Sequence, residues 1–362
     1  MNDTCLLIII SYNQLSYTRA CVQSVLENTA YPYHLLIIDN GSHEETRTYL
    51  RGLQDRDEVT VVFNTENQGW IGGVNQGLSF GDYAYYCVMN NDIIVYPGWL
   101  GEMVAVVRSD PRVGLVNPEW EVPSRYQEDH RRFFQTEVVP RKGQWVESDW
   151  MRGFCFLIRR DVVRAIGGLD PAYGAGYYDD WDYSVRAVAA GYLCARALGA
   201  FVYHCKNITF TGLMKKFEYD ANFNRNKAIF YNRWGRPLRI LVIYTPDLHK
   251  RRAFIQDVLR RLLRDQNNLF LWHTEADPLI HHTNCVSRSC SVKRLKWRVL
   301  GHLLDNYRHA LRKHYNVILC SRLVARRLRA WPGIPKAYPV VCLEDLPESR
   351  AFEEVRRFKM YR

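Results

Sequence analysis

Short apolar runs alternate with amphipathic segments along the first quarter of the chain. Residues 6–10, 34–38, 59–63 and 83–89 are apolar and end in polar turns, a pattern typical of buried strands. Between the first two runs, residues 16–28 carry apolar side chains at helical spacing. This β-α-β-α-β order predicts an α/β fold with a mostly parallel sheet and right-handed crossovers.

Polar residues directly follow three of these four strands, as Ser11-Tyr12-Asn13, Asp39-Asn40-Gly41-Ser42 and Asn90-Asn91-Asp92. Ligands of open α/β sheets bind at the carboxyl ends of the strands. An aspartate there either caps a turn, accepts a hydrogen bond from a nucleobase or ribose, or holds a divalent cation. No Gly-x-Gly-x-x-Gly or Walker-type motif follows the first strand, which disfavours a dinucleotide dehydrogenase or a P-loop ATPase.

A second acidic cluster contains Asp179, Asp180 and Asp182. Neighbouring carboxylates raise one another's pKa, which suits a general base. The same aspartates also favour the positive end of a helix dipole, and the two interpretations are compatible. A strand at residues 201–203 then leads to His204, which is either structural or a metal ligand.

The C-terminal part repeats the alternation of strands and helices on a smaller scale. Apolar strand candidates and stretches with helical spacing predict a small, Rossmann-like α/β domain over residues 238–362. The expected strands are 238–244, 269–272, 317–320 and 340–343, and the expected helices lie near 254–263 and 299–311.

Charge is divided unevenly between the two parts. The chain has a net charge of +11, with +14 in residues 238–362 and −3 in residues 1–237, so we expect a domain border near Pro237. A basic surface binds nucleic acid, anionic membrane or a charged glycan, or aids solubility. Peripheral membrane contact and a homo-oligomer both stay open.

The cysteines and the apolar runs indicate a cytoplasmic protein. Ten cysteines occur without a Cys-x-x-Cys motif, and most lie in apolar stretches where a thiol acts as a small hydrophobe. Cys285 and Cys290, preceded by His281 and His282, form either a zinc site or a surface loop. The longest apolar run, residues 5–10, is far shorter than the roughly 20 residues that span a membrane.

Taken in order, the motifs of residues 4–232 resemble the family-2 inverting glycosyltransferases, in particular the rhamnosyltransferase-like members. Ile9-Ile10-Ser11-Tyr12-Asn13 and Ile37-Ile38-Asp39-Asn40 resemble the nucleotide-binding strand ends, and residues 67–77 resemble a glycine-rich loop of the family. Residues 153–160, followed by Gly167-Gly168-Leu169-Asp170, resemble the segment before the acceptor site. Asn90-Asn91-Asp92 stands at the position of the Asp-x-Asp motif and keeps only its last carboxylate.

The resemblance implies a GT-A fold and assigns roles to particular residues. Asp180 is the base, with Asp179 as the alternative, while Asp92 and His204 hold Mn²⁺ or Mg²⁺. Trp150, Gly153 and Trp181 are assigned to the acceptor, where the tryptophans either stack on sugar faces or pack ordinarily. The residues assigned to the nucleotide-sugar are Ser11, Tyr12, Asn13, Asp39, Asn40, Asn67, Gly73, Asn75, Asn91 and Asp92.

The expected activity is transfer of a sugar from a UDP- or dTDP-sugar to a hydroxyl of a glycan or lipid-linked acceptor, in the synthesis of a polysaccharide or another glycoconjugate. A cation would neutralise the leaving diphosphate, and the base would activate the acceptor with inversion. The alternative is a non-catalytic nucleic-acid or membrane binding protein on a degenerate scaffold. Retention of Asp39, Asp92, Asp180 and His204 favours the enzyme and disfavours nucleic acid as a partner.

Overall fold

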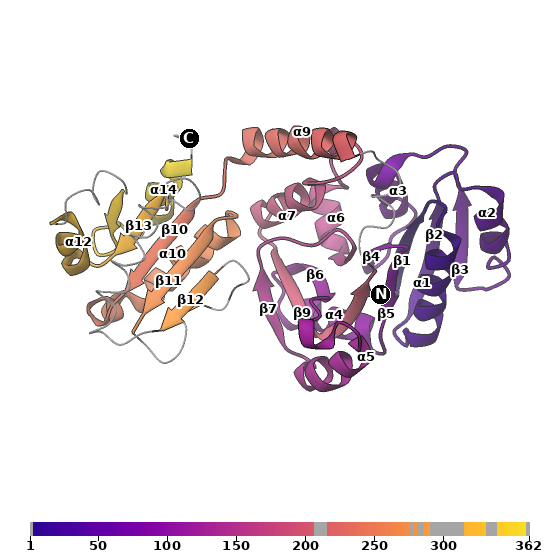
Figure 1. The fold of residues 1–362 in the computed structure, drawn as a ribbon, viewed down its shortest axis with the longest axis horizontal. Coiled ribbons are helices and arrows are strands. Elements are labelled where there is room, and N and C mark those ends of the chain that lie inside the picture. Colours follow the sequence, from indigo (N-terminus) through magenta and orange to yellow (C-terminus); the bar gives the residue numbers. More distant parts are fainter. Residues whose placement is uncertain are drawn as a thin grey trace. The chain divides into compact units, whose positions relative to one another are not determined.

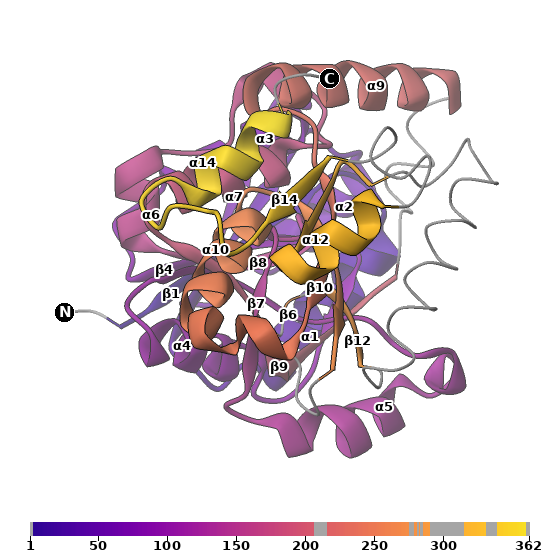
Figure 2. The same ribbon diagram turned by 90° about the vertical axis from the view of Figure 1, so that its left-hand side faces the viewer.

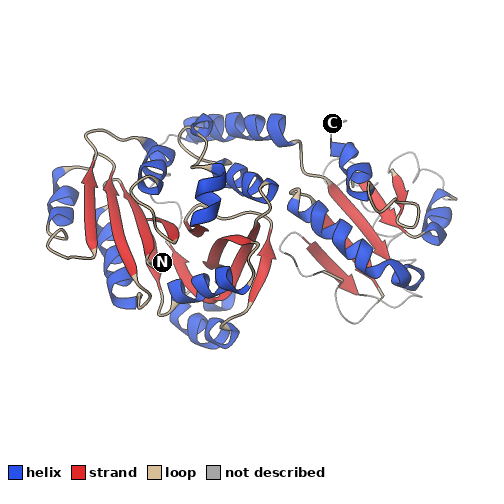
Figure 3. Cartoon of the chain, turned by 180° about the vertical axis from the view of Figure 1, so that it is seen from behind, coloured by secondary structure: helices blue, strands red, loops and turns tan. Residues whose placement is uncertain are grey.

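The computed structural model divides the chain into two compact units, Met1–Phe230 and Tyr231–Arg362 (Figure 1). The sequence analysis expects the border a few residues later, near Pro237. The residues that the structure describes are 3–205, 216–274, 279–280, 282, 285–289, 315–330 and 339–359. Figure 3 shows helices flanking the strands in both units, as expected for an α/β protein.

The first unit is built on a nine-stranded sheet with the order β3-β2-β1-β4-β8-β6-β9-β5, to which β7 adds by pairing with β9. The four strands from β3 to β4 run parallel, as predicted from the apolar runs. From β8 onward parallel and antiparallel pairs are mixed. The strands are β1 Cys5–Ser11, β2 Tyr33–Asp39, β3 Val59–Phe63, β4 Tyr85–Asn90, β5 Ile93–Val95, β6 Val113–Glu119, β7 Trp145–Ser148, β8 Cys155–Arg159 and β9 Leu193–His204.

Helices cover both faces of this sheet because the side chains of β1 alternate between two apolar layers. Cys5, Leu7 and Ile9 pack in one core with the helices α1 and α4. Ile8 and Ile10 face α3 on the opposite side. The helices of the unit are α1 Leu15–Asn28, α2 Glu44–Arg51, α3 Gly69–Leu78, α4 Trp99–Ser109, α5 His130–Phe133, α6 Arg160–Ile166, α7 Asp179–Ala189 and α9 Lys216–Trp234.

The glycine-rich segment expected as a loop is largely helical, which corrects that expectation. Gly69–Leu78 forms α3. Gly73 and Gly77, four residues apart, lie on the face of α3 that meets β1. A Cβ at Gly73 would lie 3.1 Å from Ile10, and one at Gly77 would overlap Ile8. These two glycines therefore let a helix approach a strand closely.

Strand register brings the polar strand ends together at one edge of the sheet. Ser11 pairs in register with Asp39, and Ile10 pairs with Asn90. The parallel arrangement thus places the ends of β1, β2 and β4 side by side, where the sequence predicts ligand binding.

The second unit is a smaller α/β domain, as predicted. Its five parallel strands have the order β12-β11-β10-β13-β14, which is a doubly wound arrangement. In Figure 2, α10 and α14 lie on one side of the sheet and α12 on the other, each over its own apolar core. The elements are β10 Arg239–Tyr244, α10 Arg252–Arg264, β11 Asn268–His273, β12 Cys285–Ser289, β13 Val317–Cys320, α12 Arg322–Arg329, β14 Val340–Cys342 and α14 Ala351–Arg356.

Two expectations for this unit fall partly outside the described residues. The expected helix near 299–311 lies outside the described residues. The expected zinc site lies partly outside them, since His281 and Cys290 are not described. Within the described part of the chain, no helix is long and apolar enough to cross a membrane.

Candidate active site

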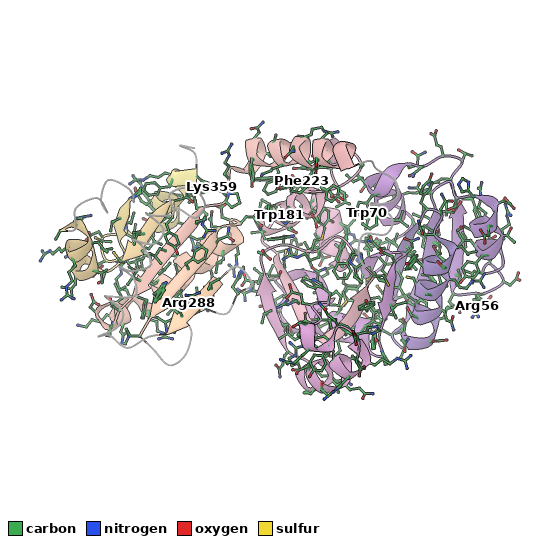
Figure 4. All side chains as sticks on the ribbon, in the orientation of Figure 1. Arg56, Trp70, Trp181, Phe223, Arg288 and Lys359 are labelled. Atoms are coloured by element: carbon green, nitrogen blue, oxygen red, sulfur yellow. The ribbon has the colours of Figure 1, made fainter. Side chains whose placement is uncertain are left out.

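A cavity of about 440 Å³ lies in the first unit, where the ends of several strands meet α7 and α9. It is lined by residues from segments far apart in the sequence. Figure 4 labels three of them, Trp70 from α3, Trp181 from α7 and Phe223 from α9. The lining residues are Trp70, Asn90, Asp92, Arg152, Gly153, Phe154, Gly176, Tyr177, Tyr178, Asp179, Asp180, Trp181, His204 and Phe223.

One wall of the cavity holds an aspartate and a histidine in direct contact. Strand β5 pairs with the end of β9, with Ile93 opposite His204, and this pairing brings Asp92 to the histidine. His204 Nε2 lies 3.3 Å from Asp92 Oδ1, and the imidazole ring stacks on Phe154 at a centroid distance of 4.9 Å.

The chemistry of this pair fits a divalent cation. Apart from their contact with each other, Asp92 Oδ1 and His204 Nε2 are buried atoms without a hydrogen-bond partner among the described residues. Both are atom types that bind Mg²⁺ or Mn²⁺. No group of three or more acidic, histidine or cysteine ligands occurs in the described ranges. A cation here would therefore take its remaining ligands from a substrate phosphate and water.

The cavity lining also carries the two adjacent carboxylates at the start of α7. Asp179 is 4% exposed, and its Oδ2 accepts a hydrogen bond from Trp70 Nε1 at 3.2 Å. Asp180 is partly exposed to the cavity and accepts hydrogen bonds from the backbone N–H of Gly153 at 3.2 Å and of Trp181 at 2.9 Å. Burial raises the pKa of both carboxyls, and the charge of Asp180 raises the pKa of Asp179 further.

Arg152 is a lining residue that the sequence analysis did not identify. Its guanidinium lies 3.5 Å from the ring centroid of Trp150 and 3.6 Å from Asp149 Oδ1. It opposes the effect of burial on Asp180, because a nearby cation lowers the pKa of a carboxyl. In the sequence, the signal for Arg152 as a site residue was its position next to Gly153. A single arginine in an apolar stretch is weak evidence for a role in a site.

Asp182, the third member of the acidic cluster, serves the scaffold. It is wholly buried, pairs with Arg186 Nε at 2.8 Å and accepts a hydrogen bond from the Tyr173 hydroxyl at 3.2 Å. Its carboxylate therefore stabilises the first turns of α7.

Of the candidate nucleotide residues, Asp92 lines the cavity, whereas those at the ends of β1 and β2 are not among its lining residues. Asp39 is fully buried, with its Oδ2 3.3 Å from Arg47 Nε. Asn40 donates to Asn67 Oδ1 at 2.9 Å and to the carbonyl of Gly69 at 3.0 Å, which ties the strand end to the start of α3. Both side chains therefore shape the edge of the sheet.

The remaining candidates also have internal contacts. Asn13 has a φ of 55°, and its Oδ1 accepts a hydrogen bond from the backbone N–H of His43 at 2.8 Å. The Ser11 hydroxyl lies 3.3 Å from the Thr18 hydroxyl, and the neighbouring residue Tyr12 is half-buried. Asn91 donates to the Thr18 hydroxyl at 2.9 Å.

Three further candidates are not among the residues that line the cavity, and each has a contact within the first unit. Asn75 holds Leu169 by bonding both its N–H, at 2.8 Å, and its carbonyl, at 2.9 Å. Gly73 packs on β1, and Trp150 packs against Trp181 at a centroid distance of 4.3 Å.

The sequence of the first unit matches a known protein family. Residues 6–167 match the model of Glycosyl transferase family 2. The matched stretch lies within the first unit. The resemblance inferred from the motifs is confirmed over these residues, and the α/β sheet of the first unit agrees with the GT-A fold that it implies.

Several individual proteins are similar to this chain. A glucosyl-dolichyl phosphate glucuronosyltransferase of Haloferax volcanii is 25% identical over 70% of this chain and 82% of its own. An N-acetylglucosaminyl-diphospho-decaprenol L-rhamnosyltransferase of Mycobacterium tuberculosis is 23% identical over 57% of this chain and 77% of its own. An uncharacterised protein of Sinorhizobium fredii is 24% identical over 63% of this chain, which covers 27% of that protein's length.

Among solved structures, a mannosyltransferase of Pyrobaculum calidifontis in complex with GDP-Man and Mn²⁺ has a TM-score of 0.43 and 19% identity, over 54% of each chain.

Proposed function

We propose that this glycosyltransferase moves a sugar, with inversion, from a UDP- or dTDP-sugar to a hydroxyl of a lipid-linked glycan acceptor. The observation that carries this proposal is that one cavity contains both the Asp92–His204 pair and the Asp179–Asp180 pair. The names of the Haloferax and Mycobacterium relatives both describe transfer to a lipid-linked sugar, which supports an acceptor of this class.

Asp92 and His204 would hold the divalent cation, and His204 is oriented for this by its stacking on Phe154. When bound, a cation supplies positive charge for the diphosphate that leaves the sugar. The retained aspartate and the histidine are sufficient in this role, since such cations often have only one or two protein ligands.

Asp180 is the proposed general base. It is the more exposed carboxylate of the pair, and the Gly153 and Trp181 N–H groups orient it. It takes the proton of the acceptor hydroxyl as the oxygen attacks the sugar C1, while the C1–O bond to the diphosphate breaks. Attack opposite the leaving group inverts the anomeric centre. Asp179, held by Trp70, is the alternative base.

A binding and turnover series tests this proposal. We expect UDP or dTDP, added with Mn²⁺, to raise the stability of the protein by about 2.7 kcal/mol at roughly 100 times the dissociation constant. Asp92→Ala should lose the dependence on Mn²⁺. Asp180→Asn should bind the nucleotide as the wild type does and lose about 10²- to 10⁴-fold in transfer.

Two outcomes would count against these assignments. Wild-type turnover by Asp180→Asn would exclude Asp180 as the base. An absence of any shift across UDP, dTDP, GDP, CMP and ADP, with and without Mn²⁺, would contradict the nucleotide-sugar donor itself.

A further inference from the structure

Two consecutive tyrosines immediately before the carboxylate pair have left-handed backbone conformations. Tyr177 has a φ of 72° and Tyr178 a φ of 67°, and both line the cavity. Such angles are unfavourable for residues with a Cβ and persist only where surrounding contacts enforce them. Because α7 begins at Asp179, this turn sets the direction in which the helix and its first carboxylates leave it.

A single buried amide on α9 binds three carbonyls of this turn. Asn226 is fully buried, and its Nδ2 lies 2.7 Å from the carbonyl oxygen of Tyr173, 2.7 Å from that of Gly176 and 3.1 Å from that of Tyr177. Its Oδ1 is buried and has no hydrogen-bond partner among the described residues. Its side-chain hydrogen bonds to the turn are therefore all made by the amide as donor.

Neighbouring residues on the same face of α9 support this contact. Asn222 donates to the Gly176 carbonyl at 3.2 Å, and Arg225 donates to the Ala172 carbonyl at 2.6 Å. Positions 222, 225 and 226 are three to four residues apart, so they share one helix face. In addition, the Tyr178 ring packs on Phe223 and Phe230 at centroid distances of 5.4 and 5.5 Å.

We propose that Asn226 is a positioning residue for transfer: it holds the turn at residues 173–178 and so orients Asp180 toward the acceptor hydroxyl. The inference rests on the proposed role of Asp180 as base. Asn226 acts through the backbone of the turn, since it is not among the residues that line the cavity. Loss of the Asn226 amide should therefore affect the chemical step more than nucleotide binding, because we assign nucleotide binding to residues at the strand ends.

The main test compares Asn226→Ala with Asn224→Ala in the full chain. Asn224 is an exposed asparagine two residues away on the same helix, which makes it a matched control. Loss of the amide should lower the turnover number by about 100-fold, the order expected when a catalytic group is displaced by about 1 Å. The dissociation constant for UDP or dTDP with Mn²⁺ should stay unchanged. Asn224→Ala should behave as the wild type in both measurements.

Hydrogen–deuterium exchange supplies a second readout that does not depend on activity. The turn contains a bond from the Gly176 N–H to the Tyr173 carbonyl at 3.3 Å, and the Asp182 N–H donates to the Tyr178 carbonyl at 2.9 Å. In Asn226→Ala we expect faster exchange confined to residues 174–182. Wild-type exchange there, or a wild-type turnover number, would overturn the proposal.

A second variant and the wild-type turnover complete the test. If Asn226→Ala does not fold, Asn222→Ala removes one bond to the same turn and should lower turnover with unchanged nucleotide binding, and an absence of this effect would overturn the proposal. If the wild type turns over no UDP- or dTDP-sugar, the proposed function fails. Exchange in residues 174–182 then still decides whether Asn226 holds the turn.

Discussion

At the scale of single residues, the candidate base depends on a balance between burial and one cation. Burial raises the pKa of Asp180, and the Arg152 guanidinium lowers it. Arg152 itself lies partly buried against Trp150, and burial lowers its pKa, so its charge is weakly screened where it faces the carboxylate. In the proposed mechanism the ionised form of Asp180 accepts the proton, so this balance should set the lower pH limit of activity.

We predict that Arg152→Met moves this lower pH limit upward. Without the cation, the pKa of Asp180 rises further above its usual value, so a higher pH is needed to ionise the base. The pH profile of the turnover number measures the change. Arg164→Met, on the exposed side of α6, is the control because Arg164 pairs with Asp82 away from the cavity. A profile that is the same in Arg152→Met and in the wild type would contradict the role of Arg152.

At the scale of elements, the position of α3 depends on glycines that allow it to approach β1. The helix carries Trp70, which reaches the cavity and binds Asp179, so its distance from the sheet is also a feature of the site. The sequence analysis expected a glycine-rich loop here and assigned Gly73 to the nucleotide-sugar. The structure instead shows that Gly73 and Gly77 approach Ile10 and Ile8.

We predict opposite effects for two Gly→Ala substitutions in helices of the first unit. Gly77→Ala places a Cβ into Ile8 and should destabilise the unit by about 1–3 kcal/mol, as overpacking does. Gly101→Ala in α4 meets open space and should stabilise it by about 0.5–1 kcal/mol, because alanine loses less conformational entropy. Melting temperatures give the comparison, and a neutral Gly77→Ala would show that α3 can move away from β1.

At the scale of the whole molecule, the two units have separate apolar cores. One core gathers around β1 and its neighbours, and the other two lie on the faces of the sheet of β10–β14. The cavity with the carboxylate pairs is formed by residues of the first unit. A ligand of that cavity should therefore act on the stability of one unit.

We predict two unfolding transitions in calorimetry, of which UDP or dTDP with Mn²⁺ raises only one. Binding stabilises the unit that contains the site by mass action, and a unit with its own core unfolds independently. Comparison with Asp92→Ala identifies the transition that belongs to the first unit. A single cooperative transition, or an equal shift of both, would contradict independent units.

Local patterns in the sequence determined the alternation of strands and helices and the polar strand ends. Apolar runs such as residues 6–10 signal a buried parallel strand without reference to the rest of the chain. The order of the motifs indicated the family resemblance, and the match over residues 6–167 confirmed it for that stretch. The start of the first helix differed slightly: α1 begins at Leu15 rather than Ser16, after two residues with positive φ.

Tertiary structure alone decided which of these residues meet and which merely stabilise the scaffold. Asn75 belongs to the motif pattern, yet its partner Leu169 lies 94 positions away. Arg152 and Asn226 belong to no recognisable motif, because their proposed roles come from tertiary contacts. Arg152 packs on Trp150, and Asn226 binds the carbonyl of Tyr177, 49 positions earlier in the chain. Periodicity reports burial along one segment, whereas contacts between distant segments appear only once the sheet and its helices are assembled.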